Sequence, residues 1–177
     1  GNQSFLNFQV RSVSNNKTRR LINKQKAYDA VMPFASKNTF QRNDIKLEFP
    51  KNSFYDTLYF QYDKEQINGE SDFYSDMHKI HNIYTPVHKN FSLSIKALEL
   101  PATLTEKAFV ARLKDGEYEY KGGEMINGFI STNVREFGNY VVMVDNEQPE
   151  IKPFVFSNEK LSFKIRDELT GIKTFNG

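Results

Sequence analysis

The sequence predicts an all-β protein, an immunoglobulin-like antiparallel β-sandwich with part of a second β module at the C-terminus. Apolar and polar residues alternate at period two in several short stretches, which is typical of strands with one buried face. Turn-forming residues separate these stretches at intervals of about ten residues, as in a sandwich or barrel. A polar, proline-containing stretch at 145–150 divides the last alternating segments from the rest.

The clearest alternation is at residues 91–97, where every second side chain is apolar. A helix would need apolar residues three and four positions apart, and these stretches do not have them. The same pattern predicts further strands at residues 6–10, 45–49, 58–62 and 161–165.

Turn residues predict how the middle of the chain reverses. Asp115-Gly116 is a leading signal for a type I′ hairpin, and Gly122-Gly123 is expected to turn the chain again. Residues 107–134 are therefore predicted to form a three-stranded meander. The polar segment 68–76 is predicted to be a loop.

Three regions are expected along the chain. Residues 1–26 form an N-terminal strand and a basic connector, 27–145 the sandwich domain, and 146–177 a linker and a partial second module. Residues 15–26 hold five basic side chains and no acid, a composition typical of a solvated connector. The chain begins Gly1-Asn2-Gln3 without a signal peptide, which suggests a segment of a longer protein.

Composition excludes several classes of protein. The 16 Phe and 9 Tyr, with no Trp, indicate an aromatic core. A net charge of +2, from 24 basic and 22 acidic residues, argues against nucleic acid as a partner. No apolar run approaches the ~20 residues of a membrane span. The absence of Cys excludes disulfides and Cys-based zinc sites.

The histidines His78, His81 and His88 are the first candidates for a metal site. Two histidines three residues apart can share zinc on one helix face. The sequence around His78 and His81 favours a strand, where positions three apart point to opposite faces. We therefore expect no metal ligands here, and no cofactor.

Carboxylates are the second candidates. Glu117, Glu119 and Glu124 flank the Gly-Gly turn, and a pair 5–10 Å apart could act on a sugar as acid and base. An ordinary solvent-facing strand has the same spacing. No nucleophile-elbow, Walker-type or dinucleotide-type motif is present. No catalytic residue is predicted.

Tyrosines are the third candidates, as a platform that stacks on sugars or peptides. Tyr118 and Tyr120 share one strand face, and Tyr55, Tyr59 and Tyr74 lie elsewhere. The simpler interpretation is that these rings pack against the protein while their hydroxyl groups stay in contact with water. It is favoured because Trp, the strongest stacking residue, is absent.

A structural motif precedes the apolar strand at 140–144. Glu136-Phe137-Gly138-Asn139-Tyr140 resembles the tyrosine corner of immunoglobulin-like sandwiches. In that motif the Tyr hydroxyl bonds to the backbone upstream and fixes a crossing between the sheets.

Four segments taken together resemble a known family: residues 49–58, 86–97, 135–153 and 167–172. In this order they are similar to the non-catalytic β-sandwich region that follows the peptidase domain of Gram-negative lysostaphin-type zinc metallopeptidases. Residues 1–4 look like the last strand of a preceding sandwich. The family's His-x-x-x-Asp and His-x-His zinc motifs do not occur in this sequence. The resemblance therefore implies an accessory region of a peptidoglycan hydrolase.

These observations lead to ranked functional expectations. The first is a non-catalytic spacing, docking or wall-contact region of an exported peptidoglycan metallopeptidase, located in the periplasm or cell envelope. Its partners would be peptidoglycan or another domain of the same protein. The second is a stand-alone adhesion or glycan-binding module, and the third is an enzyme that uses the histidines or glutamates.

Overall fold

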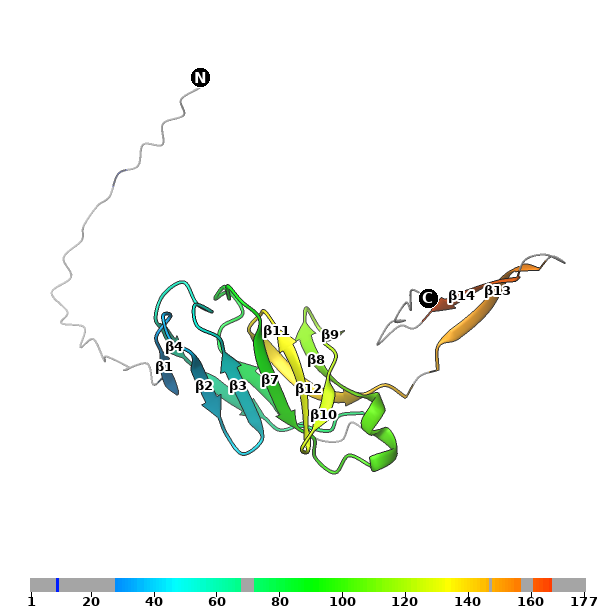
Figure 1. Cartoon of the computed structure of the whole chain (residues 1–177), viewed down its shortest axis with the longest axis horizontal. Helices are drawn as coiled ribbons and strands as arrows, with labels where there is room; N and C mark the ends of the chain where they lie inside the picture. Colours follow the sequence, from blue (N-terminus) through cyan, green and yellow to red (C-terminus); the bar gives the residue numbers. More distant parts are fainter. Residues whose placement is uncertain (1–8, 10–27, 68–71, 147, 157–160, 167–177) are drawn as a thin grey trace, which may run out of the picture.

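Two five-stranded antiparallel sheets pack face to face in the computed structural model, which describes residues 9, 28–67, 72–146, 148–156 and 161–166 (Figure 1). This arrangement confirms the predicted all-β sandwich. The chain passes repeatedly from one sheet to the other, so that strands adjacent in sequence pair as hairpins and then cross over.

The first sheet has the spatial order β10 (Glu124–Ile126), β11 (Phe129–Val134), β7 (Phe91–Lys96), β3 (Ile45–Phe49) and β2 (Asn38–Gln41). The second has the order β5 (Tyr62–Glu65), β6 (Met77–Ile80), β12 (Gly138–Val144), β8 (Ala108–Lys114) and β9 (Glu117–Tyr120). Two further pairs are β1 (Ala30–Met32) with β4 (Leu58–Phe60), and β13 (Glu150–Phe156) with β14 (Leu161–Arg166).

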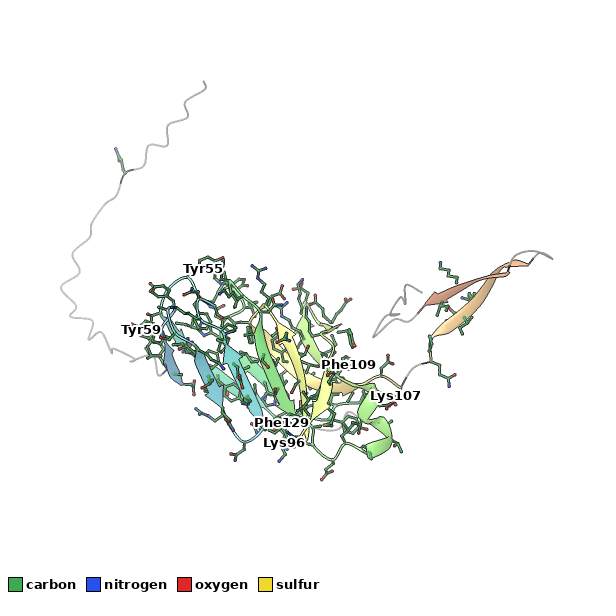
Figure 2. The ribbon with its side chains drawn as sticks, viewed as in Figure 1. Tyr55, Tyr59, Lys96, Lys107, Phe109 and Phe129 are labelled. Carbon is green, nitrogen blue, oxygen red and sulfur yellow. The ribbon has the colours of Figure 1, made fainter. Side chains whose placement is uncertain are left out.

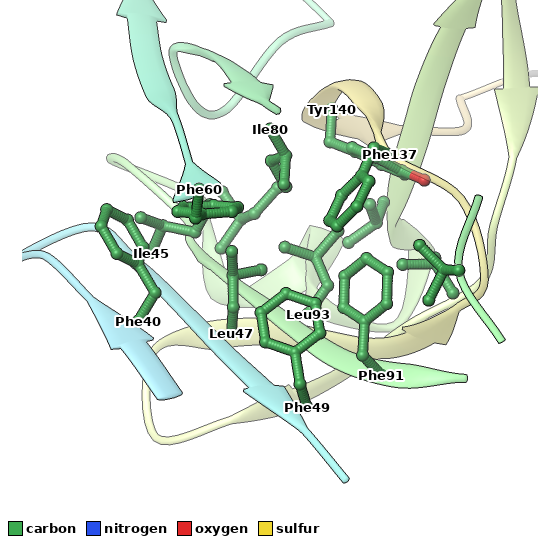
Figure 3. Packing of buried hydrophobic residues seen from close by; sticks show 14 of the residues in the cluster. Phe40, Ile45, Leu47, Phe49, Phe60, Ile80, Phe91, Leu93, Phe137 and Tyr140 are labelled. Atoms are coloured by element: carbon green, nitrogen blue, oxygen red, sulfur yellow. The ribbon is translucent and has the colours of Figure 1, made fainter. Parts of the chain in front are cut away.

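Aromatic side chains fill the space between the sheets (Figure 3). The ring centroid of Phe49 lies 4.6 Å from that of Phe91 and 6.1 Å from that of Phe137. Phe60 reaches the same cluster from β4 and packs at 4.8 Å against Phe40. The core is as aromatic as the composition predicts, and these rings hold the two sheets together through buried apolar area.

The second sheet is also apolar on its outer face. Phe109, Val141 and Met143 are buried there in a separate cluster. Phe73 packs against this cluster, and its backbone forms an isolated bridge with Met143. The described part of the loop predicted at 68–76 therefore covers the outer face of the second sheet. The strand β6 begins directly after it, at Met77.

The turns partly follow the prediction. Asp115 and Gly116 both have positive φ, 52° and 89°, as a type I′ turn requires, and they join β8 to β9. The three-stranded meander at 107–134 is wrong, because Gly122-Gly123 carries the chain from β9 in one sheet to β10 in the other. A second tight hairpin joins β10 to β11 through Asn127-Gly128, where both φ angles are again positive.

The alternating stretches at 45–49, 91–97 and 161–165 are confirmed as β3, β7 and β14. The stretch at 58–62 is two strands rather than one, since the chain leaves β4 after Phe60 and enters β5 of the second sheet at Tyr62. The strand predicted at 6–10 and the basic connector at 15–26 lie outside the described residues.

Residues 102–107 form the helical element η1 (Ala102–Lys107), a 3₁₀ segment that precedes β8. Among the described residues no helix has the length and apolar content needed to cross a bilayer. The ribbon β13–β14 follows the sandwich, and Ile151 faces Ile165 across it with both side chains exposed.

Candidate functional site

The first candidate, His78, lies on β6 and is fully buried. Its Nδ1 atom is 2.8 Å from the hydroxyl of Tyr62 on the neighbouring strand β5. Its Nε2 atom is buried without a hydrogen-bond partner. Burial disfavours the charged imidazolium and lowers the pKa of His78 to about 4. The ring is therefore neutral near pH 7 and serves as a packed core group.

Charged groups surround this histidine at the edge between the sheets. The ammonium of Lys64 is 2.6 Å from Asp44 and 3.1 Å from Asp76, so one lysine bridges two carboxylates. These hydrogen bonds raise the pKa of Lys64 above its usual value, with Asp44 contributing first. The lysine occupies the position between the carboxylates where a cation would otherwise be expected.

The other two histidines have separate partners. His81 follows β6 with φ of 51°, and its ring packs at 5.0 Å against Phe137 and at 5.8 Å against Phe60. His88 lies in the β6–β7 loop, edge-on to the ring of Tyr55 at 5.3 Å. Within the part of the chain that the structure describes, no three His, Asp or Glu side chains form a group able to hold a metal ion.

Glu119 of the β8–β9 hairpin is engaged with cations. Glu119 is 3.0 Å from Lys121, 3.3 Å from Lys114 and 3.7 Å from Arg112. The hydrogen bond from Lys121 helps to hold the pKa of Glu119 below its usual value. A carboxyl with a lowered pKa is ionised near pH 7 and is a poor general acid. Glu117 and Glu124 are exposed on β9 and β10.

The tyrosines of β9 pack as the simpler interpretation expects. Tyr118 lies edge-on to Phe73 at 5.1 Å, on the outer apolar cluster of the second sheet. Tyr120 packs at 5.0 Å against Phe109. Tyr74 is half-buried at the margin of the main core. These three rings contribute to stability.

The predicted tyrosine corner is present. The hydroxyl of Tyr140 donates a 2.6 Å hydrogen bond to the backbone carbonyl of Glu136. Arg112, buried on β8, bonds the Glu136 carboxylate and donates to the carbonyl of Phe137 at 3.1 Å. A Cβ on Gly138 would lie 2.8 Å from the Arg112 Nε atom, so glycine leaves room for the guanidinium. This cluster fixes the crossing from β11 to β12.

Two exposed aromatic rings meet at the pair β1–β4, with Tyr28 just before β1 and Tyr59 on β4. The ring centroids of Tyr28 and Tyr59 are 4.7 Å apart and the planes meet at 37°. Their side chains are 46% and 52% exposed, and Val31, directly opposite Tyr59, is 57% exposed. We call these three residues the tyrosine surface. Figure 2 shows Tyr59 at the outer side of this pair, with Tyr55 at the same end of the sandwich.

A polar groove of about 350 Å³ lies beside the tyrosine surface. Asp29 follows Tyr28 in sequence, and Gln61 lies two positions beyond Tyr59, so both chain segments of the tyrosine surface lead directly to residues that line the groove. The residues that line the groove are Asp29, Gln61, Tyr62, Asp63, Lys79, His81 and Asn82.

The alternation at 58–62 already separates Tyr59 from the buried Leu58 and Phe60. Tyr28 carries no such signal, because its contact with Tyr59 depends on the long-range pairing of β1 with β4. Sequence reasoning therefore named Tyr59 as a candidate and missed its partner.

Comparisons with known proteins identify the family of the chain. No curated protein matches the chain. The family model described as the Zu5-like domain matches residues 29–145, well over half of the chain and nearly all of the described sandwich. This chain belongs to the Zu5-like domain family.

Proposed function

We propose that this chain is a non-catalytic accessory module of an exported peptidoglycan metallopeptidase, and that it contacts the cell wall. The observation that carries the proposal is a contrast between the candidate reactive side chains and the tyrosine surface. His78 and Glu119 are engaged in packing and ion pairs, whereas the tyrosine surface faces solvent beside a polar groove.

The buried histidine and the paired glutamates support a non-catalytic role. His78 is enclosed and has a pKa of about 4, so it has no access to a substrate. Glu119 is held by three cations. General acid–base chemistry requires a group that can reach the proton it transfers, and the enclosed His78 cannot do this. Glu119 is partly exposed, but its cationic partners keep its carboxyl ionised, which makes it a poor general acid.

The frame itself supports a docking role. A sandwich with an aromatic core is rigid, while its loops and edges are free to carry a binding surface. The β3–β4 and β6–β7 loops are tied together at one end of the sandwich, where the His88 amide donates to the Ser53 carbonyl at 2.8 Å and the Lys89 ammonium donates to the Lys51 carbonyl at 2.9 Å. The surface beside them is thus held in a defined shape.

The metallopeptidase parent, and with it the periplasmic or envelope location, is supported by the four sequence segments that resemble such proteins. The reading frame upstream of Gly1 tests this part of the proposal. A His-x-x-x-Asp motif and a His-x-His motif encoded there are expected. A complete upstream domain without them would contradict it.

The wall-contact role is tested by incubating the purified protein with isolated peptidoglycan sacculi. We expect the protein in the pellet and no soluble muropeptides in the supernatant by liquid chromatography. Protein that stays in the supernatant would contradict wall contact. Muropeptides released by the chain alone would contradict the non-catalytic assignment.

A second candidate is a stand-alone adhesion or glycan-binding module of the envelope, and the exposed Tyr28–Tyr59 pair favours it. Both candidates use the same surface and differ in whether a peptidase precedes the module. The upstream reading frame decides between them.

A further inference from the structure

We propose that the tyrosine surface and its groove form a binding site for an uncharged polysaccharide built of pyranose rings. This inference rests on the proposed wall contact and names its ligand class. Its elements are the Tyr28–Tyr59 pair, which joins the residue before Asp29 to β4, and the polar side chains of the groove, which include Asp29 and Gln61.

The ring pair suits the apolar face of a sugar. The axial C–H groups of a pyranose form a flat apolar patch that packs on an aromatic ring, while the hydroxyls point outward around the rim. Tyr28 and Tyr59 meet at 37° and about half of each side chain is exposed, so each presents a face that a sugar ring can cover. Tyrosine adds contact area at low entropic cost because it has few rotatable bonds.

Val31 extends the apolar area across the strand pair. It lies directly opposite Tyr59 and points to the same side of the sheet. An exposed apolar cluster rimmed by polar groups is typical of a binding site.

The groove supplies hydrogen-bond acceptors, and the Lys79 ammonium, which is paired with Glu65 at 2.6 Å, supplies donors. Asp29 and Asp63 contribute carboxylate oxygens, which are acceptors. Gln61 and Asn82 also line the groove, and the Asn82 Oδ1 atom accepts the backbone N–H of Tyr84 at 2.9 Å. A ligand that fits must bring donors together with an apolar face, and sugar hydroxyls do so. A proline-rich peptide also stacks on tyrosines, but its proline residues have no backbone N–H to offer these carboxylates.

The two carboxylates are held in place. Asp29 Oδ2 accepts the backbone N–H of Tyr62 at 2.9 Å, and its other oxygen is 3.5 Å from Arg42. Asp63 Oδ1 accepts the N–H of Lys64 at 2.8 Å. Each carboxylate keeps further lone pairs for a ligand. Binding therefore requires little reordering of the site, which favours affinity.

Isothermal titration of the full chain with a soluble hexamer of β-1,4-linked N-acetylglucosamine tests the proposal. The wild-type protein is expected to bind. Tyr59→Ala and Tyr28→Ala are each expected to weaken binding by about tenfold or more. Tyr59→Phe keeps the ring and is expected to bind like the wild type. Tyr120→Ala, on β9 at the opposite edge of the second sheet, is the matched control and is expected to bind normally.

Melting temperatures of all variants separate loss of the site from loss of the fold. Hexamer binding that Tyr59→Ala leaves unchanged would overturn the proposal, and so would equal weakening in Tyr120→Ala. A wild-type protein that pellets with sacculi but does not bind the hexamer would also overturn it, while the wall-contact function would stand. If the protein fails to bind the hexamer but binds a lysine-rich peptide, and salt weakens that binding, the proposal is overturned and the groove is an acidic docking site instead.

Discussion

Two neighbouring residues of β4 show how the molecule divides its aromatic side chains. Phe60 is fully buried and packs in the main core, whereas Tyr59 is 52% exposed and stacks on Tyr28. The pleat of a strand sends successive side chains to opposite faces, so residues one position apart serve different purposes. Interior rings hold the sheets together, and the exterior pair is available to a ligand.

The largest expected effect comes from removing an interior ring. Phe60→Ala leaves a cavity beside Phe40, Phe49 and His81. We expect the free energy of unfolding to fall by about 3–5 kcal/mol, the usual cost of such a truncation in a packed core. Urea unfolding followed by circular dichroism measures the change. A loss below about 1 kcal/mol would show that Phe60 is not in the core as described.

Because His78 is buried, the free energy of unfolding is expected to depend on pH in a way that an exposed histidine would not cause. The pKa of His78 is about 4 in the folded protein, and an unfolded histidine titrates near 6.5. Between these values the unfolded state binds a proton more readily, so acid favours unfolding. Stability due to His78 is fully present above pH ~6.5 and falls by at most about 1.4 kcal/mol per pH unit down to ~4.

The His78→Gln variant isolates this effect, because glutamine can bond the Tyr62 hydroxyl but does not titrate. Urea unfolding at several pH values compares it with the wild type. A flatter profile between pH ~6.5 and ~4 is expected for the variant. Parallel profiles would contradict a buried, neutral His78.

A smaller effect is expected at the tyrosine corner. Tyr140→Phe keeps the buried ring and removes its hydrogen bond to the Glu136 carbonyl. One neutral hydrogen bond contributes about 1 kcal/mol, so the melting temperature should fall by a few degrees. Differential scanning calorimetry measures this shift. An unchanged melting temperature would count against a stabilising role for the corner.

Local patterns predicted the parts of the fold that depend on neighbouring residues. Period-two alternation located β3 and β7, and Asp115-Gly116 located the β8–β9 hairpin. The spacing between Glu136 and Tyr140 predicted the corner, because its hydrogen bond spans only four residues.

Long-range pairing decided the rest. Gly122-Gly123 permits both a reversal within a sheet and a crossing between sheets. The pairing of β11 with β7 selects the crossing, because it places the β10–β11 hairpin in the first sheet. The break at Gln61 has the same origin, since Leu58–Phe60 pairs with β1 and Tyr62–Glu65 pairs with β6. The candidate site lies at this junction. Its tyrosine pair and groove therefore could not be assembled from sequence alone.

Sedimentation of Tyr59→Ala with isolated sacculi tests most directly whether surface rings bind while interior rings stabilise. The substitution removes an exposed ring and leaves the core cluster untouched. We predict that pelleting is lost while the free energy of unfolding changes by less than about 0.5 kcal/mol. Pelleting equal to that of the wild type would contradict this division, and so would loss of pelleting that only follows from unfolding.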